Sequence, residues 1–427
     1  MMILKLKQSK LFKNTFLYTL IQLINKGVPF LLLPILTRYL STDDYGIIAT
    51  YNTFIALLVI FIGLSMEGAV SVNFFQLEEE KFRKYVSNIF NLMIASTFLV
   101  TLVVIFFQEL IISKFTIPVI WIYIAIAVAL VQTITGINLT LWRSQQCAKP
   151  YAVYALSQTF FNIMISLLLI IGLNYQWEGR TAAIASVSIF FGLLSIIFIY
   201  KKGYAKFNYS VEYIKDALKF GIPLLPHQMA LWMRSGVDIL LIATIVGTSQ
   251  SGIYSVGYTF GAVVGIFATA FNNAYSPYLF EKLKSLSEQS KIKIVKFTYL
   301  YFIGIILFAI LLNGVFVLIL PYYLGEKFQE ASQYIIWIAL AYSFQGMYLM
   351  VVNYIFYAKK THFLSMITIF TSIFHVVLSY ILIQNYGALG AAYASVISFL
   401  LTFVLVFRIS YKVYAMPWIL WRKNDNS

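Results

Sequence analysis

Long apolar runs alternate with short polar segments along the whole chain. Each run holds about 20 residues, which as a helix crosses the roughly 30 Å hydrocarbon core of a bilayer. A membrane β-barrel would instead show short segments of alternating polarity. The pattern therefore predicts an all-α integral membrane protein. The twelve predicted spans cover residues 16–37, 46–70, 87–108, 118–140, 152–173, 181–200, 219–245, 253–277, 297–320, 334–357, 364–384 and 391–409.

The chain also contains an internal repeat. Residues 182–190 read AAIASVSIF and residues 391–399 read AAYASVISF, with six of nine positions identical at an offset of 209. Residues 45–54 (YGIIATYNTF) and 251–260 (SGIYSVGYTF) share four positions at an offset of 206. Similar membrane halves with a substrate path between them are typical of transporters. We therefore expect an N-terminal six-helix lobe at 1–210 and a C-terminal six-helix lobe at 211–427.

The basic residues predict how these spans are oriented. If the amino terminus is cytoplasmic, 25 of the 31 Lys and Arg residues fall on the inside, four fall on the outside and two fall within spans. Such an excess of positive charge marks the cytoplasmic side. Both termini are then cytoplasmic, and six spans per half make the two lobes a parallel repeat. The net charge of +15 reflects this topology and attraction to anionic lipids, so we expect no nucleic-acid partner.

Composition and loop length narrow the function. The chain is 61% hydrophobic and 11% charged, and its longest outside loop, about 321–333, is too short to fold as a domain. No phosphate-binding loop for ATP occurs, so transport would draw on another source, such as an H⁺ or Na⁺ gradient. The single cysteine, Cys147, excludes an intramolecular disulfide and a cysteine-based metal cluster. We expect no cofactor and no metal site.

Two cations lie deep within the apolar runs and are candidate substrate ligands. Lys26 is near the middle of the first span, and Arg234 is near the middle of the seventh, the first span of the second half. Charges at such depth usually face a cavity or a partner. Two facing cations would suit an anionic group such as pyrophosphate. Asp238, one helical turn after Arg234, is a third candidate for substrate binding in this central cavity. A structural ion pair between Arg234 and Asp238 is the competing interpretation.

Further residues are candidates for gating or coupling. Glu67 lies near the cytoplasmic end of the second span, where an ordinary interfacial carboxylate is the alternative, and His375 lies in the middle of the eleventh. Proline breaks or kinks helices, and broken helices at equivalent places in two halves indicate a transport site. Pro29 in the first span, with Pro223 and Pro226 in the seventh, follow this pattern. Static kinks are the alternative.

Two motifs resemble those of a known family. The first span ends in ILTRYLSTDDYG (residues 35–46), with Arg38, Leu40-Ser41 and Asp44-Tyr45-Gly46. The second half carries Asp238-Ile239-Leu240 and then Ser251-Gly252-Ile253-Tyr254. In these features the chain resembles the Wzx-type O-antigen flippases of the multidrug/oligosaccharidyl-lipid/polysaccharide (MOP) exporter superfamily. Length and helix number agree across the chain, and we add Arg38 to the gating or coupling candidates.

The resemblance implies a MATE-like, V-shaped bundle of two lobes in the bacterial cytoplasmic (inner) membrane. It implies alternating-access transfer of an undecaprenyl-pyrophosphate-linked oligosaccharide, for lipopolysaccharide O-antigen or another surface polysaccharide, and no enzyme activity. A polysaccharide polymerase and a chain-length regulator are implied partners, besides membrane lipids. The alternatives are a cation-coupled multidrug exporter of the same superfamily, a membrane-embedded glycan polymerase, and a peptidoglycan-precursor flippase, which usually has fourteen helices.

Overall fold

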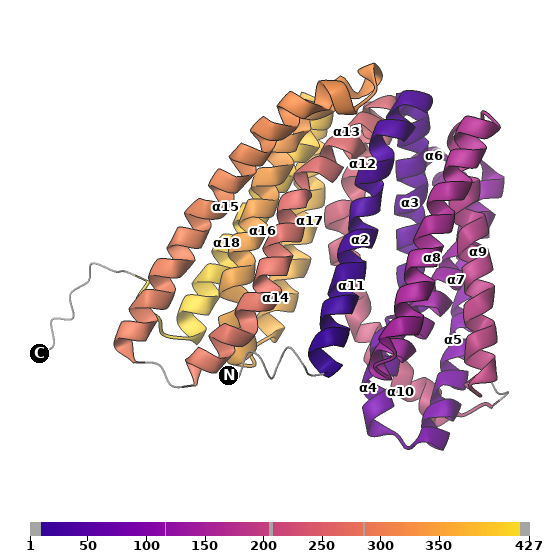
Figure 1. Cartoon of the computed structure of the whole chain (residues 1–427), viewed down its shortest axis with the longest axis horizontal. Helices are drawn as coiled ribbons and strands as arrows, with labels where there is room; N and C mark the ends of the chain where they lie inside the picture. Colours follow the sequence, from indigo (N-terminus) through magenta and orange to yellow (C-terminus); the bar gives the residue numbers. More distant parts are fainter. Residues whose placement is uncertain (1–9, 116, 205–207, 285–286, 419–427) are drawn as a thin grey trace, which may run out of the picture. The chain divides into compact units, whose positions relative to one another are not determined.

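The computed structural model describes residues 10–115, 117–204, 208–284 and 287–418, apart from the side chains of residues 10–16, 18–20, 22, 23, 26 and 29. Within these ranges the chain is helical and contains no strand (Figure 1). The molecule divides into two compact units between Trp232 and Met233. We call the described residues up to Trp232 unit 1 and those from Met233 unit 2.

Unit 1 contains the helices that match the first six predicted spans and the beginning of the seventh. They are α2 (Lys10–Tyr39), α3 (Thr42–Gly63), α4 (Met66–Gln76), α5 (Glu79–Phe106), α6 (Gln108–Phe115), α7 (Val119–Ser144), α8 (Ala148–Leu167) with a π-helical end (Leu168–Gly172), α9 (Trp177–Lys201), α10 (Val211–Gly221), a 3₁₀ turn (Ile222–Leu224) and α11 (Leu225–Ser235), which runs on into unit 2.

Unit 2 contains the rest of the seventh span and the five that follow. Its helices are α12 (Val237–Ile245), α13 (Thr248–Gly261), α14 (Val263–Leu283), α15 (Glu288–Tyr323), a 3₁₀ segment (Glu326–Ala331), α16 (Ser332–Tyr357), α17 (His362–Tyr386) and α18 (Ala388–Val413).

The all-α membrane fold predicted from the sequence is confirmed, since each of the twelve predicted spans overlaps a helix. Among the described residues, ten helices are long and apolar enough to cross a membrane, and the interrupted pair Val211–Ser235 and Val237–Ile245 makes an eleventh if counted as one span. The first predicted span falls in α2, where the described stretch Phe30–Tyr39 is apolar. The backbone of α2 is helical from Lys10 to Tyr39, Pro29 included.

The start of the predicted second lobe packs on unit 1. Ala217 of α10 belongs to the buried cluster formed by α4, α5 and α7, and Gly221 lies directly against the backbone oxygen of Leu64. A glycine is needed there because any side chain would collide with that carbonyl. The predicted lobe boundary at residue 210 stays a prediction.

The internal repeat is visible in how each unit packs. In unit 1, α9 packs on α7 and α8; in unit 2, α18 packs on α16 and α17. These are the fourth, fifth and sixth spans of each predicted half. The repeated segments 182–190 and 391–399 thus lie in equivalent helices, α9 and α18, which explains why small residues recur there.

The outer surface of α15 is apolar, as expected for a helix that faces lipid. Leu300, Leu307, Leu311 and Leu318 are each at least 60% exposed. In water such a surface would be a binding patch or would aggregate, but in a bilayer it contacts lipid tails. The chain is a multi-pass membrane protein.

The LSTDD motif that begins α3 is a helix cap. The Ser41 hydroxyl accepts a hydrogen bond from the Asp44 backbone N–H at 3.1 Å, and Asp44 Oδ2 accepts one from the Ser41 backbone N–H at 2.9 Å. This reciprocal pair is a capping box, which satisfies backbone donors that the helix leaves free.

Replacing Ser41 with alanine is expected to lower stability by about 1 kcal/mol, the usual contribution of such a cap. Thermal unfolding of the purified protein in detergent measures this loss in stability. Ser65→Ala is the matched control, because Ser65 begins α4 without a side-chain cap hydrogen bond. Equal losses from both variants would show that the capping box contributes nothing.

Candidate functional site

The seventh span is interrupted where its charged residues lie. Pro223 occupies the 3₁₀ turn between α10 and α11, and Pro226 lies in the first turn of α11. Helix α11 then ends at Ser235, and α12 begins at Val237 after Gly236. Arg234 therefore lies in the last turn of α11. Asp238 lies in the first turn of α12, where the helix dipole favours a carboxylate.

Arg234 is held by hydroxyl groups on α17 and α18. Its Nε donates to Ser372 Oγ at 3.2 Å, and its Nη2 donates to Thr402 Oγ1 at 2.6 Å and to Thr371 Oγ1. The guanidinium carbon lies 5.3 Å from the centre of the Phe399 ring, a distance at which the ring face attracts a cation. Neutral partners orient the guanidinium and leave its charge uncompensated.

The ion pair between Arg234 and Asp238, considered from their spacing, is not formed. Among the described residues, Arg234 makes no salt bridge, and the cation within ion-pair range of Asp238 is His375 when protonated. The reason is the interruption at Gly236, because side chains four residues apart meet only on a continuous helix.

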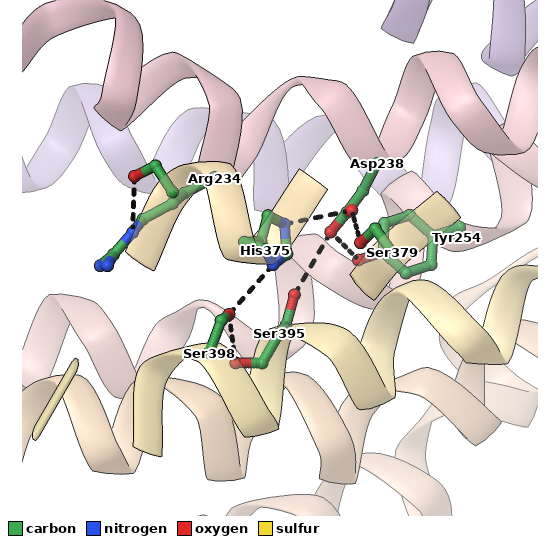
Figure 2. A network of polar contacts seen from close by, with 8 residues as sticks. Arg234, Asp238, Tyr254, His375, Ser379, Ser395 and Ser398 are labelled. Atoms are coloured by element: carbon green, nitrogen blue, oxygen red, sulfur yellow. Dashed lines mark hydrogen bonds and ion pairs between the residues drawn. The ribbon is translucent and has the colours of Figure 1, made fainter. Parts of the chain in front are cut away.

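Asp238 lies in a buried network of its own (Figure 2). Ser379 donates to its Oδ1 at 2.5 Å, while Tyr254 and Ser395 donate to its Oδ2, each at 3.3 Å. The side chain is 1% exposed. Four helices, α12, α13, α17 and α18, thus meet at one carboxylate, which needs these donors because a bare buried charge is very unfavourable.

His375 completes this network. Its Nε2 lies 3.2 Å from Asp238 Oδ1, within ion-pair range when the imidazole is protonated, although the direction is not that of a hydrogen bond. Its Nδ1 lies 3.0 Å from Ser398 Oγ. Ser398 in turn connects to the Arg234 site, since Thr402 donates to the Ser398 carbonyl oxygen at 2.7 Å. The acid, the imidazole and the guanidinium thus lie along one polar path through unit 2.

Glu67 lies between two neighbouring hollows of unit 1. It is half-buried in the first turn of α4, against Gly136 of α7. A side chain at position 136 would occupy the space of the Glu67 carboxylate. The hollows have volumes of about 380 and 450 Å³, and Glu67 lines both.

The second of these hollows also carries a cation. Arg143 lines it, is exposed, and donates to Thr140 Oγ1 at 2.7 Å. Arg143 lies close enough to attract the Glu67 carboxylate, yet no salt bridge joins the two among the described residues. Glu67 thus lines both hollows, and Arg143 lines one of them.

Two predicted residues, Lys26 and Pro29, have side chains outside the described residues, so their roles stay predictions. Arg38 lies exposed in the last turn of α2, where a cation complements the helix dipole. No group of three or more metal-binding side chains occurs in the described part of the chain.

Several site residues were not found from the sequence. Ser379, Ser395, Ser398 and Tyr254 belong to the Asp238 network. For the three serines, the available signal was their spacing on α17 and α18. Ser372, His375 and Ser379 recur at intervals of three and four residues, as do Ser395, Ser398 and Thr402, which places each set on one helix face.

Arg180 was also missed, because its position suggested an outside loop. The structure places it in the first turn of α9, donating to Asn162 Oδ1 at 2.6 Å and Ser166 Oγ at 2.5 Å. It is thus a second arginine held by neutral groups, in unit 1.

Comparison with known proteins supplies the family. A family model described as "Polysaccharide biosynthesis protein" matches residues 11–282. A protein of Haemophilus influenzae named "Uncharacterized membrane protein" is 29% identical over 428 residues, covering 94% of this chain and 98% of that protein. A second protein of that organism, "Lsg locus putative protein 1", is 27% identical over 375 residues and covers 86% and 90%.

Two solved structures share the fold. An inward-facing multidrug resistance MATE family transporter of the MOP superfamily has a TM-score of 0.66 at 15% identity, covering 91% of this chain and 94% of that one. Lipid II flippase MurJ, in an inward closed conformation, has a TM-score of 0.65 at 16% identity, covering 94% and 87%. The resemblance drawn from the two sequence motifs is confirmed by the family match and this fold. The chain belongs to the polysaccharide biosynthesis protein family.

Proposed function

We propose that this protein moves a polyprenyl-pyrophosphate-linked oligosaccharide, such as an undecaprenyl-linked repeat unit of O-antigen or another surface polysaccharide, from the inner to the outer leaflet of the bacterial cytoplasmic membrane. The physical task is to shield a charged, sugar-bearing headgroup that hydrocarbon rejects. The family match supports a substrate from polysaccharide biosynthesis. In this proposal both termini are cytoplasmic, and the protein is a carrier without catalytic chemistry.

The observation that carries the proposal is the environment of Arg234. Its guanidinium is oriented by three hydroxyls and a ring face, with no carboxylate in ion-pair range among the described residues. A cation in a membrane helix is costly and persists where it has a function. Arginine presents a planar fork that matches phosphate oxygens. We assign Arg234 to the pyrophosphate, or to acidic sugars, with Lys26 as its counterpart in unit 1.

Arg143 and Glu67 fit an earlier step on the same route. The charge pattern predicts that the α7–α8 connection, and hence Arg143, lies at the cytoplasmic side. An exposed guanidinium lining a hollow of about 450 Å³ would attract the pyrophosphate at entry. The carboxylate of Glu67, which lines both hollows, would repel the pyrophosphate. This repulsion would favour movement of the substrate from the entry hollow toward the next site. We propose Glu67 as the gate.

The Asp238–His375 pair is the proposed coupling element. A buried carboxylate and an imidazole 3.2 Å apart can share or release a proton, and the charge of the pair then changes the packing of α12 against α17. A ligand or an ion can drive transport only if it binds the inward-facing and outward-facing conformations with different affinities. Protonation from the outer side would supply that difference if the coupling ion is H⁺.

A cation-coupled drug exporter is the main alternative. Such a site would offer a carboxylate to a cationic drug, but both oxygens of Asp238 already face Ser379, Tyr254 and Ser395. Among the described residues, the deep arginines Arg234 and Arg180 are held by neutral groups and make no salt bridge.

The direct test uses vesicles that contain the purified protein and a polyprenyl-pyrophosphate oligosaccharide labelled in its sugars. An impermeant glycosidase cleaves only the outward-facing lipid. We expect the cleavable fraction to grow with time, and to stay constant in protein-free vesicles. A constant fraction in both would contradict the proposal, and efflux of cationic dyes from the same vesicles would favour the drug exporter.

In this assay, Arg143→Gln is expected to raise the apparent KM about tenfold, because a hydrogen bond to a charged group contributes about 1.5–3 kcal/mol. Lys149→Gln is the matched control, since Lys149 is an exposed cation in the first turn of α8. An equal rise in both variants would indicate general attraction to the membrane surface, and no rise in either would remove Arg143 from the entry site.

A further inference from the structure

A groove in unit 2 has no role in the proposed transport route. It lies between the last turns of α14 and the first turns of α15 and has a volume of about 540 Å³. Its wall consists mainly of aromatic rings, from Phe271, Tyr275 and Tyr278 on α14 and Phe297 on α15. Two of these rings remain open to the surroundings, since Tyr278 is 52% exposed and Phe297 is 43% exposed.

The rings form one continuous apolar surface. Phe271 stacks on Tyr275 and Phe297 with ring centres 5.8 and 6.3 Å apart. Tyr275 lies 5.7 Å from Phe297 and 6.2 Å from Tyr278, again between ring centres. Rings that stack in this way hold one another in place, so the apolar surface is preformed. Binding of a ligand to it therefore requires little rearrangement of the protein, which favours affinity.

The same groove carries a cation at its wall. Lys293 lines it, is exposed, and makes no salt bridge among the described residues. The segment 278–296 contains five lysines and two glutamates. One of these glutamates, Glu288, lies 2.6 Å from the Nζ of Lys291, and Lys282 lies over the Tyr278 ring. The groove therefore combines an apolar wall with a positively charged edge.

We propose that this groove binds an anionic phospholipid of the surrounding leaflet, with one hydrocarbon tail on the aromatic wall and the phosphate at Lys293. Basic pockets between membrane helices on the cytoplasmic side suit anionic headgroups, and the charge pattern predicts that this end of α14 and α15 lies on that side. The outer surface of α15 already faces lipid. This inference does not depend on the transported substrate.

Native mass spectrometry of the purified protein tests the proposal, with phosphatidylglycerol and phosphatidylcholine of equal chain length as probes. We expect phosphatidylglycerol to be retained in preference to phosphatidylcholine. Lys293→Gln should weaken phosphatidylglycerol binding about fivefold, the effect of one lysine near a membrane surface. Ala274→Trp should block the groove, because Ala274 is an exposed small residue in its wall, and should reduce binding of both lipids.

Lys202→Gln is the matched control, an exposed lysine at the end of α9 that lies outside this groove. Its phosphatidylglycerol binding should equal that of the unchanged protein. Thermal unfolding in detergent confirms that each variant is folded. The proposal is overturned if both lipids bind equally, if Ala274→Trp retains full binding, or if Lys202→Gln weakens binding as much as Lys293→Gln.

Discussion

Replacing Asp238 with asparagine is expected to lower the rate of gradient-driven transport about 5- to 150-fold while leaving the protein folded. Asparagine has nearly the same shape, and the hydroxyls of Ser379, Tyr254 and Ser395 can rotate to accept from its amide as well as donate to its oxygen. The loss in stability is then limited to about 1–3 kcal/mol, the penalty for imperfect satisfaction of buried polar groups. The variant cannot bind or release a proton, so the proposed coupling through His375 is lost.

The expected loss in transport rate follows from typical coupling free energies. A ligand and a conformational change are typically coupled by about 1–3 kcal/mol, so uncoupling should lower the transport rate about 5- to 150-fold. The vesicle assay under an imposed pH gradient measures this rate. Downhill exchange of the lipid without a gradient should be much less affected, and this difference separates a coupling role from a structural one.

Ser395→Ala serves as the matched control for Asp238→Asn. It removes one long hydrogen bond of 3.3 Å and keeps the carboxylate, so transport should fall only slightly. His375→Gln should flatten the dependence of transport on pH, because it removes the second proton-binding group. Normal gradient-driven transport by Asp238→Asn would exclude the pair from coupling.

Replacing Arg234 with glutamine is expected to reduce export about 10- to 100-fold, because hydrogen bonds to charged groups contribute about 1.5–3 kcal/mol. The variant loses the positive charge proposed to bind pyrophosphate. Arg234→Lys keeps the charge but cannot donate from separate nitrogens to Ser372 and Thr402. Lysine should therefore restore export only in part, since arginine and lysine are not equivalent where a fixed fork is used.

Surface polysaccharide in a strain that lacks the native gene and carries each variant measures this effect. Arg408→Gln is the matched control, because Arg408 is an exposed arginine on α18. The same assay on Lys26→Gln, alone and combined with Arg234→Gln, tests whether the two cations act together. Normal export by the double variant would remove both from the mechanism.

The sequence by itself determined the class of protein, the positions of its helices and the residues most worth testing. Apolar runs of about 20 residues have one stable outcome in a bilayer, because every backbone group must be hydrogen-bonded within the chain. Charges inside those runs are expensive, so Arg234 and Asp238 were found as exceptions to the pattern. The family resemblance was likewise carried by local motifs, one of which is a capping box whose partners are three residues apart.

The tertiary structure alone decided which polar groups meet. His375 and Ser379 lie far along the chain from Asp238, and nothing in the local pattern of α17 specifies its rotation toward α12. That rotation is set by the packing of whole helices, which depends on small residues and side-chain shapes over their full length. The interruption at Gly236 likewise separates Arg234 from Asp238, where a continuous helix would have paired them. Sequence periodicity describes one helix at a time, whereas a binding site in a membrane protein is made between helices.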